Sequence, residues 1–286
     1  MRYLVTGITG QLGYDVVKVL KENGVKDIYA PKSSEFDITD RETVLAKTKE
    51  FKPDVIIHCA AYTKVDQAEL DMDLCYKVNV TGTENMVLAA KETDAKIIYI
   101  STDYVFDGEK NGVYEVEDKT NPQSIYGKTK LEGEQLVRAY QKHFIVRISW
   151  VFGINGNNFV KTMLKLAETH KELTVVSDQI GSPTYTYDLA KLLFAMSETS
   201  KYGTYQATNE GIYSWADFAR LILKDTDTKV TDVTTEEYQK IINKKQAPRP
   251  KNSSLSKEKL LTTGFNKLPS VEDALSRYLS ELKKEA

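Results

Sequence analysis

The sequence has few of the residues that mark a disulfide-rich or metal-binding protein. Among its 286 residues are only two cysteines, Cys59 and Cys75, and three histidines that stand far apart. Two cysteines without the spacing of metal ligands are typical of a protein whose thiols are reduced, and they give no disulfide framework. We therefore expect a cytoplasmic protein with no bound metal.

The chain also lacks a strong charge imbalance and a long apolar run. It carries 39 basic and 41 acidic residues, so its formal net charge is -2. That balance gives no electrostatic basis for binding nucleic acid or an anionic membrane. No apolar run approaches the roughly 20 residues of a membrane span, and the N-terminus lacks the basic start and apolar stretch of a signal peptide. We expect neither a nucleic-acid partner nor membrane association.

What the chain does have is a regular alternation of short apolar runs and helical patterns. Strands are predicted from the apolar runs at residues 2–6, 27–30, 55–59, 96–101 and 144–149. Helical patterns separate them, including residues 41–51 with Asp40 as the N-cap and residues 74–91. This order predicts an α/β fold with a Rossmann-like, doubly wound parallel sheet.

A glycine-rich turn follows the first predicted strand. Gly7, Gly10 and Gly13 have the spacing G-x-x-G-x-x-G, and a helical pattern begins directly after them. Glycines let the backbone approach a pyrophosphate, and the helix N-terminus offers free N–H groups and the positive end of its dipole. The strand, turn and helix together favour a dinucleotide site over a turn that binds nothing.

The end of the second predicted strand indicates which dinucleotide is bound. An NAD-specific site usually has an acid there, which holds the ribose 2′-hydroxyl. This chain has Pro31, Lys32 and Ser33 instead. A lysine and a hydroxyl can neutralise and hydrogen-bond a 2′-phosphate, so we expect NADPH, with NADH possible. The simpler interpretation of Lys32 is a solvated loop lysine.

Tyr126 and Lys130 are the candidate catalytic pair. Four residues apart on a predicted helix, they lie one turn apart on the same face. A nearby ammonium lowers the pKa of a phenol from its ordinary value of about 10, so that the hydroxyl can exchange a proton near neutral pH. The spacing alone is weak, because a surface lysine beside one of 17 tyrosines would also produce it.

These motifs, taken in order, resemble the extended short-chain dehydrogenase/reductase superfamily and, within it, the dTDP-4-dehydrorhamnose reductases. The wider resemblance is carried by the glycine turn, Ala60-Ala61, Asn79, Thr102 and Tyr126-x-x-x-Lys130, and the narrower one by residues 10–13, 101–108, 126–134, 147–153 and 178–184. It implies NAD(P)H-dependent reduction of the C4 keto group of dTDP-4-dehydro-β-L-rhamnose to dTDP-β-L-rhamnose, the last step of dTDP-L-rhamnose biosynthesis.

The resemblance gives roles to the catalytic residues that the chemistry supports. Hydride addition to a ketone creates an alkoxide, so a proton donor must lie at the carbonyl oxygen. Tyr126 is the expected donor, and Lys130 is expected to tune it and to contact the cofactor's ribose. Thr102 is expected to hydrogen-bond the same oxygen, although a strand-end threonine satisfied by its own turn is the alternative.

The resemblance also implies two sets of binding residues. For the cofactor these are Gly7, Thr9, Gly10, Gln11, Leu12, Lys32, Ser33, Asp37, Ile38, Ala60, Ala61, Thr63, Asn79, Tyr126 and Lys130. For the dTDP-sugar they are Val65, Thr102, Asp103, Tyr104, Tyr126, Trp150, Asn158 and Arg249. Arg249 suits a diphosphate through its fork of donors, with a solvated linker arginine as the alternative. For Trp150 the alternative is core packing.

We accordingly expect residues 1–150 to form a dinucleotide-binding Rossmann domain, to which some later segments return, and residues 151–286 to form mainly a smaller nucleotide-sugar-binding lobe. In that lobe, Ser214 and Ser270 are predicted to cap helices. The lysine pairs at residues 244–245 and 283–284 are expected to be solvated. A monomer or a homodimer is expected.

Three further points concern competing functions. Tyr104 follows Asp103 where the similar 4,6-dehydratases have Glu, which disfavours dehydration. Asp15 and Asp188 match the region in which some relatives hold Mg²⁺, but their short side chains lead us to expect no metal.

Two alternatives to this function stay open: a reductase of another 4-keto nucleotide sugar, and a non-catalytic NADP-binding regulatory subunit resembling the methionine adenosyltransferase β subunit.

Overall fold

Six parallel strands form the central sheet of the molecule, a computed structural model that describes residues 1–243 and 246–285. The strands, in chain order, are β1 (Tyr3–Thr6), β2 (Ile28–Tyr29), β3 (Val55–His58), β4 (Lys96–Thr102), β5 (His143–Ile148) and β10 (Gly203–Gln206). Their order across the sheet is β10-β5-β4-β3-β1-β2, and every neighbouring pair is parallel. The predicted parallel, doubly wound sheet is confirmed.

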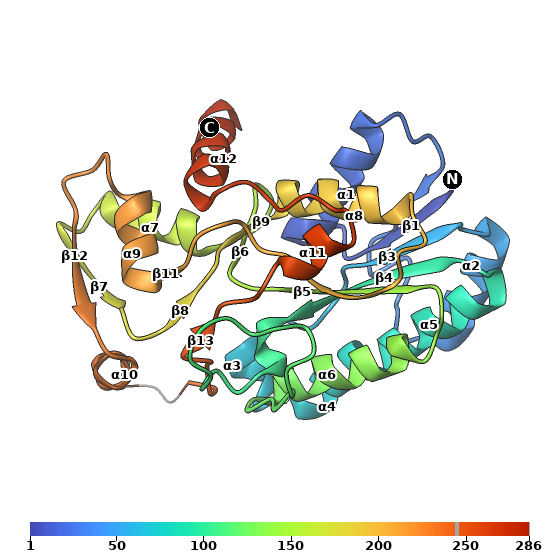
Figure 1. Cartoon of the computed structure of the whole chain (residues 1–286), viewed down its shortest axis with the longest axis horizontal. Coiled ribbons are helices and arrows are strands. Elements are labelled where there is room, and N and C mark those ends of the chain that lie inside the picture. Colours follow the sequence, from blue (N-terminus) through green and yellow to red (C-terminus); the bar gives the residue numbers. More distant parts are fainter. Residues whose placement is uncertain (244–245, 286) are drawn as a thin grey trace.

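Helices cover both faces of this sheet (Figure 1). One face carries α1 (Gln11–Glu22) and α8 (Thr186–Ser197), and the other carries α2 (Arg41–Phe51), α5 (Gly82–Thr93) and α6 (Ile125–Arg138). The pleat of β1 explains the two layers: Tyr3 and Val5 enter the apolar cluster under α1 and α8, whereas Leu4 enters the cluster under α2 and α5. Strands buried on both faces are the reason for the continuous apolar runs in the sequence.

Several predicted helix ends are present. The Asp40 side chain accepts the N–H groups of Glu42 and Thr43 at the start of α2. The Ser214 capping box opens α9 (Trp215–Ile222), and Ser270 accepts the N–H of Asp273 at the start of α12 (Val271–Glu285). Local sequence therefore sets these boundaries.

The helix predicted for residues 74–91 is wrong in detail. The structure has α4 (Met72–Tyr76), a π-helical turn η1 (Lys77–Thr81) and then α5, preceded by the short helix α3 (Val65–Ala68). The π turn contains Asn79, whose side chain bonds to groups outside its own helix. A π turn accommodates one extra residue, and such turns are frequent at functional sites.

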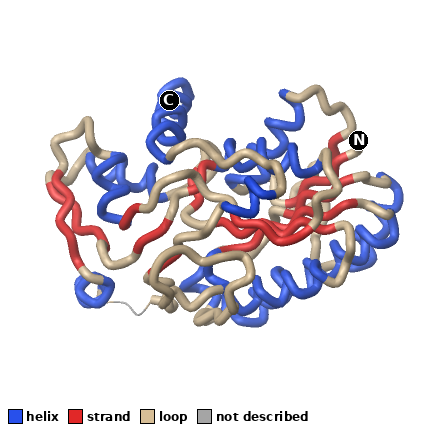
Figure 2. Tube along the Cα trace, in the orientation of Figure 1, coloured by secondary structure: helices blue, strands red, loops and turns tan. Residues whose placement is uncertain are grey.

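The second half of the chain adds a group of smaller elements beside the sheet (Figure 2). In chain order they are β6 (Val151–Phe152), α7 (Phe159–Ala167), β7 (Glu172–Val176), β8 (Ile180–Gly181), β9 (Thr184–Tyr185), β11 (Tyr213–Ser214), α9, β12 (Lys229–Val233), α10 (Thr235–Ile242), β13 (Asn252–Ser253), α11 (Glu258–Thr262) and α12. Several of them share an apolar core of their own, in which Phe152 contacts both Phe218 and Tyr278.

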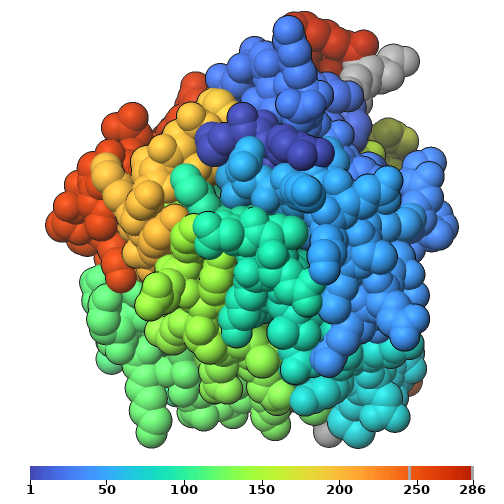
Figure 3. Space-filling model, turned by 90° about the vertical axis from the view of Figure 1, so that its right-hand side faces the viewer, coloured from blue at the N-terminus to red at the C-terminus, as the bar shows by residue number. Residues whose placement is uncertain are grey.

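Three elements of the second half nevertheless pack with the first sheet. β10 pairs with β5 at the sheet edge, α8 packs against α1, and α11 contacts β10. Leu260 of α11 lies in the apolar cluster of this sheet. Figure 3 shows the gold segment of the second half on the surface beside the blue and green first half. Lys283 and Lys284 are exposed on α12, whereas Lys244 and Lys245 lie outside the described residues. None of the described helices is long and apolar enough to cross a membrane.

Candidate active site

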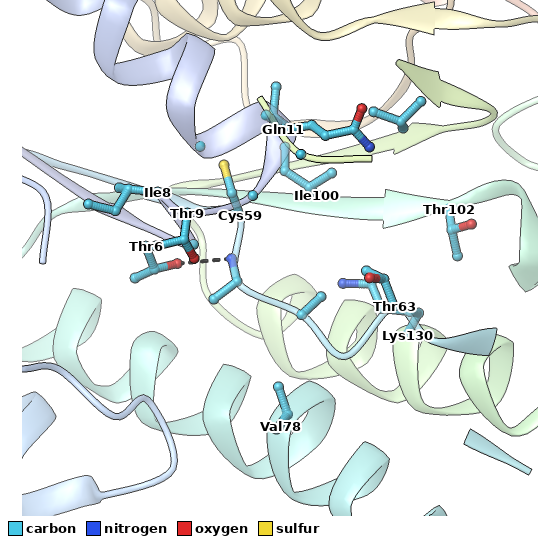
Figure 4. A pocket seen from close by; sticks show the side chains of 18 of the residues that line it. Thr6, Ile8, Thr9, Gln11, Cys59, Thr63, Val78, Ile100, Thr102 and Lys130 are labelled. Carbon is cyan, nitrogen blue, oxygen red and sulfur yellow. Dashed lines mark hydrogen bonds between the residues drawn. The ribbon is translucent and has the colours of Figure 1, made fainter. Parts of the chain in front are cut away.

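A cavity of about 660 Å³ lies at the carboxyl ends of β1, β3, β4 and β5. Open α/β sheets bind their ligands at this edge. Figure 4 shows Thr9 and Gln11 from the glycine turn on one side of it and Thr102 and Lys130 on the other. A smaller cavity of about 240 Å³ adjoins it, and Tyr104 and Trp150 line both. The site thus has a large and a small compartment with two aromatic side chains between them.

The glycine turn forms a cradle at the N-terminus of α1. Gly7 has a φ of 72°, and a Cβ there would lie 2.6 Å from the nitrogen of Ala60. A Cβ on Gly13 would lie 2.3 Å from the carbonyl oxygen of Gly7. Only glycine lets β1, β3 and α1 approach this closely. The resulting backbone cradle fits the pyrophosphate of a dinucleotide.

Nearly all residues predicted to bind the cofactor line the larger cavity. They are Gly7, Thr9, Gly10, Gln11, Leu12, Lys32, Ser33, Asp37, Ile38, Ala60, Ala61, Thr63, Tyr126 and Lys130. Asn79 lies behind the wall instead. Its side chain accepts the N–H of Tyr62 at 2.8 Å and donates to the Thr129 hydroxyl at 3.1 Å. Asn79 therefore joins the segment after β3 to α6, next to Lys130.

The segment that precedes α7 also reaches this cavity. The Asn155 amide donates to the carbonyl oxygens of Thr9 at 2.9 Å and of Gly10 at 3.2 Å, and Gly156 and Asn157 line the cavity. Sequence reasoning missed these contacts, because the segment lies more than 140 residues after the glycine turn and carries no local motif.

Tyr126 and Lys130 lie at the cavity wall on α6. A Cβ on Gly127 would lie 2.3 Å from the carbonyl oxygen of Tyr104, so glycine lets α6 approach the end of β4. The rings of Tyr104 and Tyr126 are 5.4 Å apart and nearly perpendicular. Lys130 is buried, and its ammonium lies 4.0 Å from the centre of the Tyr99 ring. The predicted pair therefore faces the end of the strand that carries Thr102.

The pKa of Tyr126 differs from the predicted direction. Burial raises the pKa of Tyr126, the hydrogen bond with Thr102 opposes the rise, and the carboxylate of Asp103 adds to it. Desolvation also lowers the pKa of Lys130 to about 7, against the attraction of Glu134. The expected lowering of the pKa of Tyr126 by Lys130 is therefore wrong for the free protein, because burial disfavours the charged form of both groups.

Thr102 and Asp103 are linked by hydrogen bonds within the protein. The Thr102 hydroxyl donates to Asp103 Oδ1 at 2.9 Å and accepts the N–H of Tyr104 at 3.2 Å. The other carboxylate oxygen of Asp103 accepts from the hydroxyl of Ser253. Burial raises the pKa of Asp103 to about 6, although both hydroxyl bonds oppose this. Asp103 lines the cavity as predicted for a sugar ligand, but protein groups already occupy both of its oxygens.

Two stacked tryptophans lie at the smaller cavity. The rings of Trp150 and Trp215 are 3.6 Å apart and inclined by 10°. Trp150 has a φ of 49°, and a Cβ on Gly181 would lie 2.8 Å from its indole, so the glycine leaves room for the ring. Gln179 and Ser253 complete this wall. Sequence reasoning missed Trp215 and Ser253, while Gln179 lies in a segment that carried the resemblance.

Among the predicted sugar-binding residues, Val65 lines the larger cavity, whereas Arg249 and Asn158 do not line it. Arg249 lines the smaller cavity, where its guanidinium donates to the two carboxylate oxygens of Asp66 at 2.9 and 3.1 Å. Asn158 lies outside the linings of both cavities and caps α7, accepting the N–H of Lys161 at 3.0 Å. Its amide also donates to the carbonyl oxygen of Gly153 at 2.8 Å.

The described part of the chain contains no group of three or more His, Cys, Asp or Glu side chains arranged to hold a metal ion. Asp188 is paired with Arg277 at 2.7 and 2.8 Å, and Asp15 accepts from Thr186. Both cysteines are free thiols. His58 is buried, and burial lowers its pKa to about 3, so the ring is neutral near pH 7.

Comparison with known proteins gives consistent matches over the whole chain. The family described as RmlD substrate binding domain matches residues 1–284. The dTDP-4-dehydrorhamnose reductase of Aggregatibacter actinomycetemcomitans is 44% identical over 274 residues, which are 91% of this chain and 92% of that protein. The crystal structure of a dTDP-4-dehydrorhamnose reductase from Clostridium acetobutylicum has a TM-score of 0.94 at 44% identity, covering 99% of this chain and 100% of that one. The enzyme of that name from Bacillus anthracis, in complex with NADP, has a TM-score of 0.93 at 43% identity, covering 98% and 99%.

Proposed function

The chain belongs to the family of the RmlD substrate binding domain, and from this membership we propose that it is an NADPH-dependent reductase of dTDP-4-dehydro-β-L-rhamnose. The product is dTDP-β-L-rhamnose, formed by reduction of the C4 ketone. The observation that carries the proposal is a single cavity lined by the glycine turn, Tyr126 and Lys130. A dinucleotide bound on the turn would extend toward Tyr126, the proton donor on α6 that faces the end of β4.

NADPH would be held mainly by backbone and small side chains. Gly7, Gly10 and Gly13 leave the N-terminus of α1 open to the pyrophosphate. Lys32 and Ser33 line the same cavity beyond β2, where they can neutralise and hydrogen-bond a 2′-phosphate. Bound there, NADPH supplies the hydride that adds to C4 of the sugar.

The chain's own residues handle the proton. Burial keeps Tyr126 in its protonated form near pH 7, so its hydroxyl can give a proton to the C4 oxygen as that oxygen gains negative charge. The O–H bond of Tyr126 breaks and an O–H bond forms on the sugar, leaving a phenolate. Lys130, one turn away, can stabilise that phenolate by its positive charge.

The sugar nucleotide would occupy both cavities. The aromatic faces of Tyr104 and Trp150 can orient the deoxysugar beside Tyr126, because both line the two cavities. Arg249 would bind the diphosphate from the smaller cavity. Since Asp66 already pairs with this arginine, we propose that the carboxylate shares or yields the guanidinium when the diphosphate binds.

The test is reduction of the sugar by purified protein. dTDP-4-dehydro-β-L-rhamnose, generated in place by the upstream epimerase, is mixed with protein and NADPH, and the loss of NADPH absorbance is followed. The sugar product is identified by chromatography. We expect dTDP-β-L-rhamnose, and at least a roughly 100-fold loss of kcat in Tyr126→Phe with NADPH still bound. If the protein binds NADPH but does not reduce this sugar, the proposed substrate is wrong.

The two alternatives make different predictions in the same assay. A reductase of another 4-keto nucleotide sugar would oxidise NADPH only with that sugar. A regulatory subunit would bind NADPH, reduce no ketone and retain a methionine adenosyltransferase catalytic subunit in a pull-down. Retention of Thr102, Tyr126 and Lys130 in one cavity favours catalysis. A cytoplasmic location and a monomeric or homodimeric state stay predictions, the latter to be tested by sedimentation.

A further inference from the structure

A buried chain of hydrogen bonds runs beneath the larger cavity, and His58 lies at its centre. His58 ends β3 and directly precedes Cys59 and Ala60, which line the cavity. Its Nδ1 lies 2.8 Å from the hydroxyl oxygen of Thr6, and its Nε2 lies 3.3 Å from that of Thr83. All three side chains are buried, and His58 and Thr83 line neither cavity. The imidazole thus bridges two hydroxyls that come from β1 and α5.

The hydrogens available fix the direction of the bond at Thr83. A hydroxyl has a single hydrogen, and a carbonyl oxygen can only accept. The Thr83 hydroxyl donates that hydrogen to the carbonyl oxygen of Asn79 at 2.7 Å. Its oxygen can therefore only accept from His58, so Nε2 of His58 must carry a hydrogen.

The direction of the bond at Thr6 follows from the neutral state of His58. Burial and the nearby charge of Lys130 lower the pKa of His58 to about 3, so the ring has one hydrogen near pH 7. With that hydrogen on Nε2, Nδ1 accepts from the hydroxyl of Thr6. The Thr6 oxygen in turn accepts the N–H of Ala60 at 3.1 Å (dashed line at Thr6 in Figure 4). The chain therefore has a single direction, from Thr6 to Asn79.

One end of this chain supports the cofactor cradle. Thr6 directly precedes Gly7, and a Cβ on Gly7 would lie 2.6 Å from the nitrogen of Ala60. That same nitrogen donates to the Thr6 hydroxyl oxygen. The hydroxyl that donates to His58 therefore also holds the contact between the glycine turn and the end of β3.

The other end of the chain reaches the catalytic helix α6. Thr83 bonds to the carbonyl oxygen of Asn79 in the π turn η1, and a Cβ on Gly133 of α6 would lie 3.0 Å from that oxygen. The Asn79 amide donates to the Thr129 hydroxyl at 3.1 Å, and this hydroxyl donates to the carbonyl oxygen of Tyr126 at 2.9 Å. The chain thus ends on the helix turn that carries the proposed proton donor.

We propose that His58 is a positioning residue, whose imidazole joins the glycine turn to the π turn beside α6 and so sets the position of Tyr126 relative to the bound cofactor. The role needs an acceptor on one side of the ring and a donor on the other, which a neutral imidazole supplies. The proposal rests on the proposed function, because the hydride comes from the cofactor on the turn and the proton from Tyr126 on α6. Both must reach the same ketone, so a small shift between them costs rate.

Thr83 is the place at which the chain can be cut away from both ligands, because it lines neither cavity. Thr83→Val keeps the shape of the side chain and removes its hydroxyl, whereas Thr83→Ser keeps the hydroxyl. Thr48→Val is the matched control, because Thr48 is buried on α2 and its hydroxyl has no hydrogen-bond partner among the described residues. His58→Phe removes both bonds of the ring and keeps an aromatic side chain.

Two kinds of measurement are made on these proteins. Kinetics give kcat and KM for the dTDP-sugar, and fluorescence gives the NADPH Kd. ¹⁵N NMR of the free protein, labelled in histidine, shows which ring nitrogen of His58 carries the hydrogen. The sequence has three histidines, and the His58 signal is the one that persists in both His143→Gln and His170→Gln.

We expect the unmodified protein to show His58 with its hydrogen on Nε2. Thr83→Val should populate the form with the hydrogen on Nδ1 and lower kcat about tenfold, within the roughly 100-fold that a misplacement of about 1 Å can cost. The NADPH Kd should not change, because the contact between Thr6 and Ala60 is kept. Thr83→Ser and Thr48→Val should match the unmodified protein, and His58→Phe should lower kcat at least as far as Thr83→Val.

Three results would overturn the proposal: a hydrogen on Nδ1 of His58 in the unmodified protein, full kcat in Thr83→Val or His58→Phe, and an equal loss of kcat in Thr48→Val. If His58→Phe does not fold, Thr83→Val and the NMR spectrum carry the test. The spectrum needs neither cofactor nor sugar. If the unmodified protein reduces no dTDP-sugar, the proposed function fails, whereas the wrong tautomer of His58 is a separate failure of the positioning link.

Discussion

The two sides of the site are built differently. The cofactor side is formed by short segments at the ends of β1, β2 and β3, and much of it is backbone, as in the turn from Gly7 to Gly13. The proposed substrate side is formed by single side chains from separate parts of the chain, such as Trp150, Trp215 and Arg249, which line the smaller cavity. Local spacing in the sequence specifies the first side, whereas only the tertiary structure assembles the second.

Gly13→Ala would break the cofactor side most severely. Its Cβ would lie 2.3 Å from the carbonyl oxygen of Gly7, so the turn must open. We expect the free energy of unfolding to fall by about 3 kcal/mol, with NADPH binding lost in isothermal titration. Gly10→Ala is the matched control, because its Cβ would meet only that same oxygen, at 3.3 Å. If the two variants are equally stable, the close approach of the Gly13 backbone to Gly7 does not limit this position to glycine.

Asp15→Asn tests the seam between the two halves, where Asp15 of α1 meets Thr186 of α8. Burial raises the pKa of Asp15 from 3.8 to about 6, so the folded state favours the protonated form. Ionisation therefore costs stability above pH 6, and the cost disappears as the pH falls toward 4. We expect the variant to be more stable by about 3 kcal/mol at pH 7.

Denaturant unfolding at pH 4, 6 and 8 measures this difference. The advantage of Asp15→Asn should shrink steadily as the pH falls from 6 to 4. An advantage that stays constant over that range would mean that the carboxyl charge is not its cause. NADPH affinity, measured on the same samples, should be unchanged because Asp15 does not line the cavity.

Trp215→Ala should affect the substrate side alone. It removes the ring that stacks on Trp150 at 3.6 Å, and the lost stacking predicts a KM for the sugar nucleotide about tenfold higher. The NADPH Kd should not change. Trp215→Phe keeps an aromatic face and should recover part of the loss. A parallel loss of NADPH affinity would show that the two sides are not separate.

Lys32→Ala should have the smallest effect and sharpen the cofactor side. Without the ammonium near the 2′-phosphate, the NADPH Kd should rise about fivefold while the NADH Kd stays the same. Fluorescence titration with both cofactors measures this ratio, and Lys21→Ala, an exposed lysine on α1 outside the cavity lining, is the control. If the affinities for NADPH and NADH fall equally, Lys32 does not contact the 2′-phosphate and is a solvated loop lysine.

The same division explains what the sequence could predict. The sheet, the caps at Asp40 and Ser214 and the glycine turn follow from local patterns, because strand ends and glycine spacing are visible in a few neighbouring residues. The structure brings the predicted Tyr126, Lys130 and Thr102 to one cavity wall. The π turn at Asn79 was not predictable, because it depends on partners near Tyr62 and Thr129.

Residues distant in the sequence account for most of the other differences between the predictions and the structure. Nothing near Arg249 in sequence shows that Asp66 would occupy its guanidinium, 183 residues away. Nothing near Asp103 shows that Ser253 would reach its carboxylate. Asn158 has the sequence of an N-cap as well as of a ligand, and in the structure it caps α7. The pKa of Tyr126 depends on burial, which spacing alone does not give.

The return of β10 and α8 to the first sheet has a consequence for the modularity of this protein. A cut or recombination point at residue 150 would separate β5 from its neighbour β10 and uncover the apolar face that α8 covers. The isolated first half would expose an unpaired strand edge, which promotes aggregation. A second half grafted from a relative at this point would therefore have to bring its own edge strand and covering helix.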